Sequence, residues 1–359
     1  MHAELTGERT GAYVGRMAAP TEITNCLGNE PLTLPEHPLV SIIIPALNEE
    51  RYIVPLLESL SGQDYGAERL EVLVADGGST DATRVLIAGF VSPFARLEVV
   101  DNPRRVTAAG LNAGMDQASG DCWIILGAHS FVRPDFVRQS VAALRRTGAA
   151  CVGGPIETIG HGPTGRAIAA AMSTPVGVGN ARFRYSNEEA EVDTVPFGCY
   201  HRKVWEVVGR FDEDIPAADD DNYNARVREA GGRIVLVPEI RSTYYARDSY
   251  RELGRQYFGY GQAKGILLRR GRRLEPRHFV PASAVAGGLL LLVSGLWLAL
   301  ARVVLLLATV AYSLAVGVGA ARSADEGANP LRVGIALGTM HVAYGTGSLL
   351  GLLRGGTAA

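Results

Sequence analysis

Lysine is almost absent from this chain of 359 residues, because Lys203 and Lys264 are the only two and arginine supplies the rest of the basic charge. The formal net charge is −2, so charge alone gives no reason to expect a nucleic-acid partner. Cysteine is also scarce, and no CxxC pair occurs, which argues against a zinc site and against a disulfide framework. The four cysteines are Cys26, Cys122, Cys151 and Cys199.

The chain also lacks several familiar segments. Residues 1–38 contain no long apolar run, so they are not a signal peptide; we expect a flexible tail, with docking on the following domain as the alternative. No GxGxxG follows the first expected strand, which disfavours a dinucleotide fold. No GxxxxGK[ST] exists, which excludes a P-loop.

Long apolar runs are concentrated at the C-terminus. Residues 279–321 carry one charge, Arg302, and are long enough for two membrane spans joined by a tight hairpin. Gly345, Gly347 and Gly351 in the third run suit close helix packing in a bilayer. A buried helical subdomain is the alternative. Within the expected membrane region, 279–359, the spans are about 281–300, 303–321 and, more weakly, 332–353.

A basic cluster precedes the first of these spans. Five arginines fall within residues 269–277, and the positive-inside rule places such a cluster on the cytoplasmic side. We therefore expect residues 251–278 to form an amphipathic segment at the membrane interface. The protein is predicted to be a multi-pass protein of the cell membrane, with the domain before the spans in the cytoplasm and the lipid bilayer as a partner.

The part between tail and spans alternates short apolar runs with helical patterns. This alternation predicts an α/β fold with a mostly parallel sheet and helices on both faces. The expected strands cover 40–44, 70–75, 97–100 and 122–126. Ligands bind beyond the carboxyl ends of such strands, at 45–49, 76–81 and 127–129. Asp76 there could accept hydrogen bonds from a base or ribose, or simply close a turn.

Several segments in fixed order resemble glycosyltransferase family 2. They are SIIIPALNEE, EVLVADGGSTDAT and GRFDEDIPAADDDNYNARVREAGGRIVLVPEI, and the resemblance covers residues 39 to about 260. VGGPIETIG, DTVPFGCYHRKVWEVVGRFDE and RQYFGYGQAK are similar to its succinoglycan-type exopolysaccharide glucosyltransferases, which also carry C-terminal membrane helices. The resemblance implies a GT-A (Rossmann-like) domain over 39–250, a nucleotide-diphosphate sugar donor, commonly UDP-linked, and an inverting reaction.

Site residues follow from the family's motifs. The resemblance implies that Asp220 is the catalytic base, with Asp219 as the fallback. A run of three aspartates at a helix start supports this role, because mutual repulsion raises one pKa and a positioned carboxylate helps remove a hydroxyl proton. The donor-binding residues implied are Pro45, Asn48, Glu49, Asp76, Gly78, Arg105, Asn112, Gly127, Ala128 and His129.

One position departs from the family pattern. A D-x-D motif usually holds a divalent cation, Mg²⁺ or Mn²⁺, whereas this chain has Gly127-Ala128-His129. Three alternatives remain: His129 binds a metal with help from the diphosphate, arginine or histidine neutralises the diphosphate without metal, or the site is inactive.

The acceptor side is less determined by sequence. Residues 246–264 supply three arginines, with Gln256 and Tyr257 next to Arg255, to face a leaving diphosphate or the acceptor. An amphipathic helix lying on headgroups would use the same arginines. We expect a polyprenyl-linked acceptor in exopolysaccharide or cell-surface glycan synthesis. The alternatives are a polyprenyl-phosphate glycosyltransferase and an inactive nucleotide-sugar-binding partner of a synthesis complex.

Overall fold

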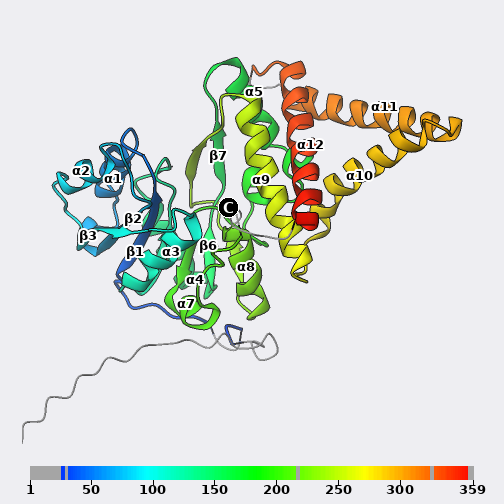
Figure 1. The fold of residues 1–359 in the computed structure, drawn as a ribbon. Coiled ribbons are helices and arrows are strands. Elements are labelled where there is room, and N and C mark those ends of the chain that lie inside the picture. Colours follow the sequence, from blue (N-terminus) through cyan, green and yellow to red (C-terminus); the bar gives the residue numbers. More distant parts are fainter. Residues whose placement is uncertain (1–25, 29–30, 216–218, 324–326, 355–359) are drawn as a thin grey trace, which may run out of the picture.

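The structure is a computed structural model that describes residues 26–28, 31–215, 219–323 and 327–354. A body of sheets and helices carries a two-helix arm on the side of its C-terminal helices (Figure 1).

Four parallel strands form the N-terminal half of the main sheet. They lie in the order β3-β2-β1-β4, so the sequence prediction of four parallel strands is confirmed. Each central strand is buried on both faces, which explains its continuous apolar run. Their bounds are β1 (Val40–Ala46), β2 (Leu70–Asp76), β3 (Arg96–Asp101) and β4 (Cys122–Ile125).

The second half of the sheet is mixed. Beyond β4 the order continues β9-β6-β10-β8, and β9 runs antiparallel between β4 and β6. A separate small sheet has the order β5-β11-β7. The strands are β5 (Phe131–Val132), β6 (Cys151–Gly153), β7 (Ile156–Ile159), β8 (Ala190–Glu191), β9 (Cys199–His201), β10 (Ile234–Leu236) and β11 (Ser242–Tyr245).

Helices cover both faces of the main sheet, as the alternating pattern predicts. Val72 packs with α1, α2 and α4 in one core, whereas its neighbour Leu73 packs with α3, α7 and α8 in the other. These helices are α1 (Ile53–Ser61), α2 (Thr83–Ala88), α3 (Thr107–Gln117), α4 (Phe136–Thr147), α7 (Arg202–Val208) and α8 (Asp219–Glu229), with 3₁₀ turns η1 (Ala67–Arg69) and η2 (Arg182–Arg184).

A second body of helices packs beside the sheet domain. Its bounds are α5 (Gly162–Met172), α6 (Pro175–Val178), α9 (Tyr250–Arg269), η3 (Pro276–His278), α10 (Phe279–Ser294), α11 (Ala299–Arg322) and α12 (Pro330–Arg354). Glycines set the contact between α9 and α12. A Cβ on Gly265 would lie 2.1 Å from the Ser348 carbonyl oxygen, and one on Gly351 would lie 2.2 Å from that of Gln262. The two backbones therefore touch, and the predicted close packing of the third apolar run is against α9.

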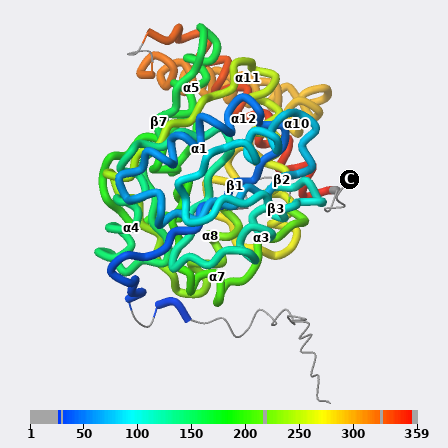
Figure 2. The backbone as a smooth tube through the Cα atoms, turned by 90° about the vertical axis from the view of Figure 1, so that its left-hand side faces the viewer, coloured from blue at the N-terminus to red at the C-terminus, as the bar shows by residue number. Residues whose placement is uncertain are grey.

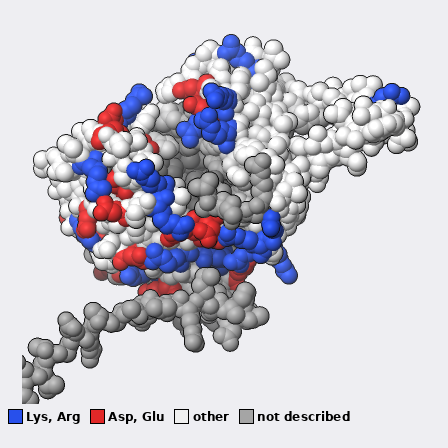
Figure 3. Space-filling view, viewed as in Figure 1, with Lys and Arg blue, Asp and Glu red and all other residues white. Residues whose placement is uncertain are grey.

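The arm consists of α10 and α11. Within the described part of the chain, two helical segments are long and apolar enough to cross a membrane, Pro276–Ser294 and Ala299–Arg322. Apart from blue atoms at its tip, the arm shows no charge in Figure 3. Leu290, Trp297 and Leu306 are among its many exposed large apolar side chains. Such an extended apolar surface indicates a membrane or another apolar partner rather than water.

Two expectations differ from the observed packing. The end of the presumed tail docks on the domain: Leu27 and Leu32 are buried, and the Leu32 amide donates to the Gly148 carbonyl at 3.4 Å. Figure 2 shows this dark-blue segment along the base of the domain. The basic cluster is also partly neutralised, because Arg270 pairs with Asp212 at 2.8 Å and Arg272 with Glu229 at 3.3 Å. Sequence-local charge patterns did not reveal these distant acidic partners.

Candidate functional site

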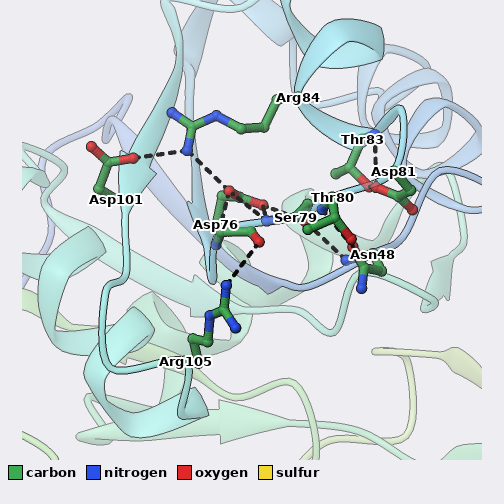
Figure 4. Close-up of polar contacts among 10 residues, drawn as sticks. Asn48, Asp76, Ser79, Thr80, Asp81, Thr83, Arg84, Asp101 and Arg105 are labelled. Carbon is green, nitrogen blue, oxygen red and sulfur yellow. Dashed lines mark hydrogen bonds and ion pairs between the residues drawn. The ribbon is translucent and has the colours of Figure 1, made fainter.

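The loops after β1 and β2 are joined by hydrogen bonds between side chains and backbone. The Asn48 amide donates to the Ser79 hydroxyl at 2.9 Å, and its side-chain oxygen accepts from the Thr80 amide at 2.8 Å (Figure 4). Asn48 has a φ of 58°, a left-handed conformation that asparagine tolerates well. Asn48 and Ser79 thus tie two loops together. Neither residue caps a helix, because α1 and α2 begin further along, at Ile53 and Thr83.

Asp76 closes the turn after β2. Its fully buried carboxylate accepts from the Gly78 amide at 3.1 Å and from the Ser79 hydroxyl at 2.5 Å, and pairs with Arg84 at 3.0 Å. Burial raises the pKa of this carboxyl, but the hydrogen bonds from Ser79, Arg84 and Gly78 outweigh burial and lower it overall. Of the two roles considered for Asp76, the observed contacts are those of the turn-closing one.

Arg105 reaches the same turn from the start of α3. Its guanidinium donates to the Gly78 carbonyl at 3.4 Å, and Gly78 has a φ of 77° (Figure 4). A Cβ on Gly78 would lie 3.2 Å from the Arg105 guanidinium, so a glycine suits this position. Arg105 therefore offers positive charge beside the β2 loop. Pro45, in β1, lies opposite Ala75 in the register.

Asn112 lies apart from these loops. Its amide oxygen accepts from the Phe211 amide at 2.8 Å, and its nitrogen donates to the Phe211 carbonyl at 3.1 Å and to Glu213 at 2.7 Å. The side chain is buried. Its observed contacts fix the segment that leads toward α8.

Gly127, Ala128 and His129 follow β4, beside the β1 loop. The His129 Nδ1 lies 3.4 Å from the Glu49 carboxylate, and the His129 ring meets the Tyr52 ring edge-on at 6.4 Å. Three loop ends that sequence analysis grouped by the strand-end rule thus meet at one edge of the sheet. Among residues the structure describes, no group of three or more histidine, cysteine, aspartate or glutamate side chains is arranged to hold a metal.

The aspartate run forms the first turn of α8. The helix begins at Asp219, and the side chain of Asp219 lies outside the described residues. The side chain of Asp220 is exposed. Partial desolvation by the protein atoms near it, and then the charge of the neighbouring Asp221, raise the pKa of Asp220 to about 6. A carboxyl with this pKa accepts protons effectively near neutral pH.

Asp221 differs sharply from its neighbour. Its carboxylate bonds to the Lys264 ammonium at 2.8 Å, and Lys264 has only 6% of its side chain exposed. Burial favours the neutral acid, but Lys264 outweighs burial and lowers the pKa of Asp221 to about 2. Sequence reasoning missed Lys264, although a lysine in a chain with only two was an available signal.

A hollow of about 440 Å³ lies along α9. It is lined by Arg247, Glu252, Arg255, Gln256, Gly259 and Tyr260. Burial and then Tyr244 raise the pKa of the Tyr260 hydroxyl to about 12, and the Asp220 charge adds to this rise, so Tyr260 links the hollow to the aspartate run.

Gln256 is held at the wall of the hollow by two tyrosines. Its amide nitrogen donates to the hydroxyls of Tyr244 at 2.9 Å and Tyr260 at 2.8 Å. Its buried oxygen has no hydrogen-bond partner within the described ranges. Tyr257, which sequence analysis placed beside Arg255 and Gln256, is instead buried in the core formed with α5 and α12. The two arginines in the lining, Arg247 and Arg255, suit a ligand that carries negative charge.

The fold and the site define a class. The large sheet, parallel in its N-terminal half, with its helices on both faces is that of a GT-A-like domain, and the chain is a glycosyltransferase. The family described as "Glycosyl transferase family 2" matches residues 41–208. The chain belongs to glycosyl transferase family 2.

Relatives agree with this assignment. One relative is the dolichyl N-acetyl-alpha-D-glucosaminyl phosphate 3-beta-D-2,3-diacetamido-2,3-dideoxy-beta-D-glucuronosyltransferase of Methanococcus voltae. The two are 34% identical over 240 residues, which cover 65% of this chain and 74% of that protein. It is 29% identical over 314 residues to the succinoglycan biosynthesis protein ExoA of Rhizobium meliloti (strain 1021), covering 85% of this chain and 92% of that one. The predicted resemblance to family 2 and to succinoglycan proteins is confirmed.

A solved structure shares the fold. The mannosyltransferase PcManGT from Pyrobaculum calidifontis, in complex with GDP-Man and Mn²⁺, matches 91% of this chain and 91% of its own with a TM-score of 0.57 and 22% identity. The GT-A expectation is therefore confirmed.

Proposed function

We propose that this protein is a membrane-attached, inverting glycosyltransferase that moves a sugar from a nucleoside-diphosphate donor to a lipid-linked acceptor. The observation that carries the proposal is the position of Asp220, a carboxylate with a raised pKa at the start of α8, beside the basic hollow along α9. The relatives named above support a lipid-linked acceptor, since one is named for a dolichyl phosphate substrate.

Asp220 acts as the base in this proposal. Its carboxylate accepts the proton of an acceptor hydroxyl while the hydroxyl oxygen attacks the anomeric carbon. The bond to the donor diphosphate breaks on the opposite side, so the nucleoside diphosphate leaves and the configuration inverts. A positioned base of this kind contributes roughly 10²- to 10⁴-fold to the rate.

The donor occupies the joined loops after β1, β2 and β4. Asn48 and Asp76 fix the shape of these loops through the hydrogen bonds described above. Glu49, His129 and Arg105 offer charged or polar atoms on or beside the same loops. UDP-sugars remain the first donors to test because of the family resemblance. GDP-sugars are tested beside them, because the solved relative was determined with GDP-Man.

A divalent cation fits this edge only in part. His129 and Glu49, 3.4 Å apart, would supply two ligands, and the donor diphosphate with water would supply the rest. Mn²⁺ accepts imidazole more readily than Mg²⁺ does. When bound, the cation would neutralise charge on the diphosphate. Without it, Arg105 is the residue placed to do so.

The hollow receives the acceptor. Arg247 and Arg255 suit the phosphates that join a glycan to its lipid, and Gln256 adds a polar side chain to the same lining. The apolar arm would hold the enzyme at the bilayer where such lipids are found. A polyprenyl phosphate and a polyprenyl-diphosphate sugar are the two acceptors to compare.

The test uses the full chain in phospholipid vesicles with radiolabelled UDP- or GDP-sugars and each acceptor, with and without EDTA. We expect transfer by the native protein and a loss of about 10³-fold in kcat for Asp220→Asn, with donor affinity kept. Asp64→Asn is the matched control, because this carboxylate pairs with Arg138 on the surface at 2.8 Å. Donor binding without turnover in the native protein would instead support a nucleotide-sugar-binding partner.

A further inference from the structure

The aspartate run is held by a residue from a different part of the chain. Lys264 extends from α9 and bonds to Asp221 at 2.8 Å, while the Asp221 amide donates to the Asp220 carboxylate at 2.9 Å. The chain of contacts thus runs from α9 through Asp221 to Asp220. We propose that Lys264 is a positioning residue, which fixes the first turn of α8 from α9 and keeps Asp220 ready to accept a proton. This inference rests on the proposed role of Asp220.

The environment of Lys264 suits this role. Lys264 is 5% exposed, and its neighbours Ala263 and Leu267 are packed in a small apolar cluster with Ile215. A buried ammonium is costly unless it is paired, so Lys264 and Asp221 are strongly held together. An ammonium is also a compact charge, whereas a guanidinium needs a wider space. This explains a lysine at this position in a chain that otherwise uses arginine almost throughout.

The helix that carries Lys264 is itself fixed. Gly261 and Gly265 flank Lys264 on α9, and a Cβ on either would lie 2.0 Å or 2.1 Å from a carbonyl oxygen of α12. On the other side, α8 is tied to the sheet domain, since Asn224 accepts from the Tyr200 hydroxyl at 2.8 Å. Lys264 and Asp221 therefore connect two rigid bodies at the point where the base lies.

Other charged or titratable groups face this pair from several elements. In the described parts of the chain they come from α9, η3, β6, β9 and α12. These groups are Tyr260, Arg277, His278, Cys151, Tyr200 and Tyr344. Of the charges that affect the pKa of Asp220 most strongly, Lys264 is the positive one and lowers it, whereas Asp221 is negative and raises it. Removing one or the other should therefore shift Asp220 in opposite directions.

The sign of each shift follows from charge. Asp220 must be unprotonated to act as a base, so kcat falls as the pH drops through its pKa, about 6 in the native protein. Lys264→Met removes a stabilising positive charge, which raises this pKa. The acid limb of the plot of kcat against pH, where kcat falls with falling pH, then moves to higher pH. Asp221→Asn removes a like charge, which lowers the pKa and moves the limb to lower pH. Each shift should be about one pH unit.

The experiment measures kcat and KM against pH for the full chain in phospholipid vesicles, with Lys264→Met, Asp221→Asn, the double variant and Lys264→Arg. We expect opposite shifts of the acid limb in the two single variants, a limb near the native one in the double variant, and donor KM within about threefold of native throughout. Lys264→Arg keeps the positive charge, so its acid limb should stay near the native one, whereas the wider guanidinium should lower kcat. These shifts separate positioning from a merely structural role, which would lower activity without moving the limb.

Equal limbs in the native protein and Lys264→Met, or shifts in the same direction in both single variants, would overturn the inference. If Lys264→Met does not fold, Asp221→Asn and the double variant decide: a double variant as far shifted as Asp221→Asn alone would overturn it. Asp220→Asn separates the two proposals. Activity retained in Asp220→Asn removes the base assignment itself, whereas an inactive Asp220→Asn with an unmoved limb in Lys264→Met removes only the role of Lys264.

Discussion

The proposed donor side and the proposed acceptor side of the site satisfy their polar groups in different ways. At the donor side, Asp76 and Asn48 use their side-chain atoms on neighbouring loop residues. At the acceptor side, the Gln256 oxygen is buried without a partner among the described residues, and arginines line an open hollow. The donor loops are thus pre-shaped by internal bonds, whereas the hollow keeps bonding capacity for a ligand. Substitutions on the donor side should cost stability, and those in the hollow should cost binding.

The largest effect on stability is expected where α9 packs against α12, a closely packed contact, unlike the hollow along the same helix. Gly265→Ala would place a Cβ 2.1 Å from the Ser348 carbonyl oxygen, which cannot move without α12. We expect a loss of about 3 kcal/mol in the free energy of unfolding, measured by denaturation in detergent. Gly254→Ala on the same helix meets Thr339 only at 3.4 Å and should be neutral or slightly stabilising. Equal stability of the two variants would contradict the described packing.

Asp76→Asn should come next. It removes the negative charge that pairs with Arg84 and accepts two hydrogen bonds from the loop, so the free energy of unfolding should fall by about 2 kcal/mol. We expect a lower Tm together with weaker binding of the nucleotide-sugar donor. Asp101→Asn, which removes the exposed partner of the same arginine, is the control and should change Tm little. A donor affinity that falls without any change in Tm would mean that Asp76 contacts the nucleotide directly.

Acid should reveal the same carboxylate. Because the pKa of Asp76 is lowered on folding, its contribution to stability is complete above its unfolded pKa of about 3.9 and is lost as the pH falls through the folded pKa. We therefore expect the Tm difference between native protein and Asp76→Asn to be constant near neutral pH and to shrink only in strong acid. A difference that shrinks already near pH 6 would assign it to another group.

The smallest effect is expected in the hollow. Gln256→Ala removes a polar side chain from the lining of the hollow, so under the proposed acceptor role the acceptor KM should rise about tenfold while Tm and donor hydrolysis stay near native. Gln139→Ala on α4 is the control, since among the described residues its side chain bonds only to Asp135, the N-cap of that helix, at 3.4 Å. An unchanged acceptor KM would place the acceptor elsewhere.

Much of this arrangement could be predicted from sequence. Short apolar runs separated by helical patterns gave the four parallel strands, and the strand-end rule brought Asn48, Asp76 and His129 to one edge. These succeed because strand periodicity and topology are local or near-local properties. The site roles inferred from the family resemblance remain predictions.

Contacts between distant segments escaped prediction. Asn48 and Ser79 are 31 residues apart in the sequence, yet the Asn48 amide bonds to the Ser79 hydroxyl. Lys264 and Asp221 are 43 residues apart, and Arg270 and Asp212 are 58 apart. Nothing in a single sequence states which acid a buried lysine meets, so the ion pairs that join α9 to the sheet domain appear only in three dimensions.

The backbone contact between α9 and α12 has a consequence for reach. At these glycines the backbones of α9 and α12 are in contact, so a shift of one helix along the other would bring side chains against backbone carbonyls. The position of α9 relative to α12 is therefore fixed. With the arm embedded in a bilayer, the hollow would stand at one height above the lipid surface. The enzyme would then select acceptors by length, accepting glycans whose reactive hydroxyl lies at that height above their lipid anchor.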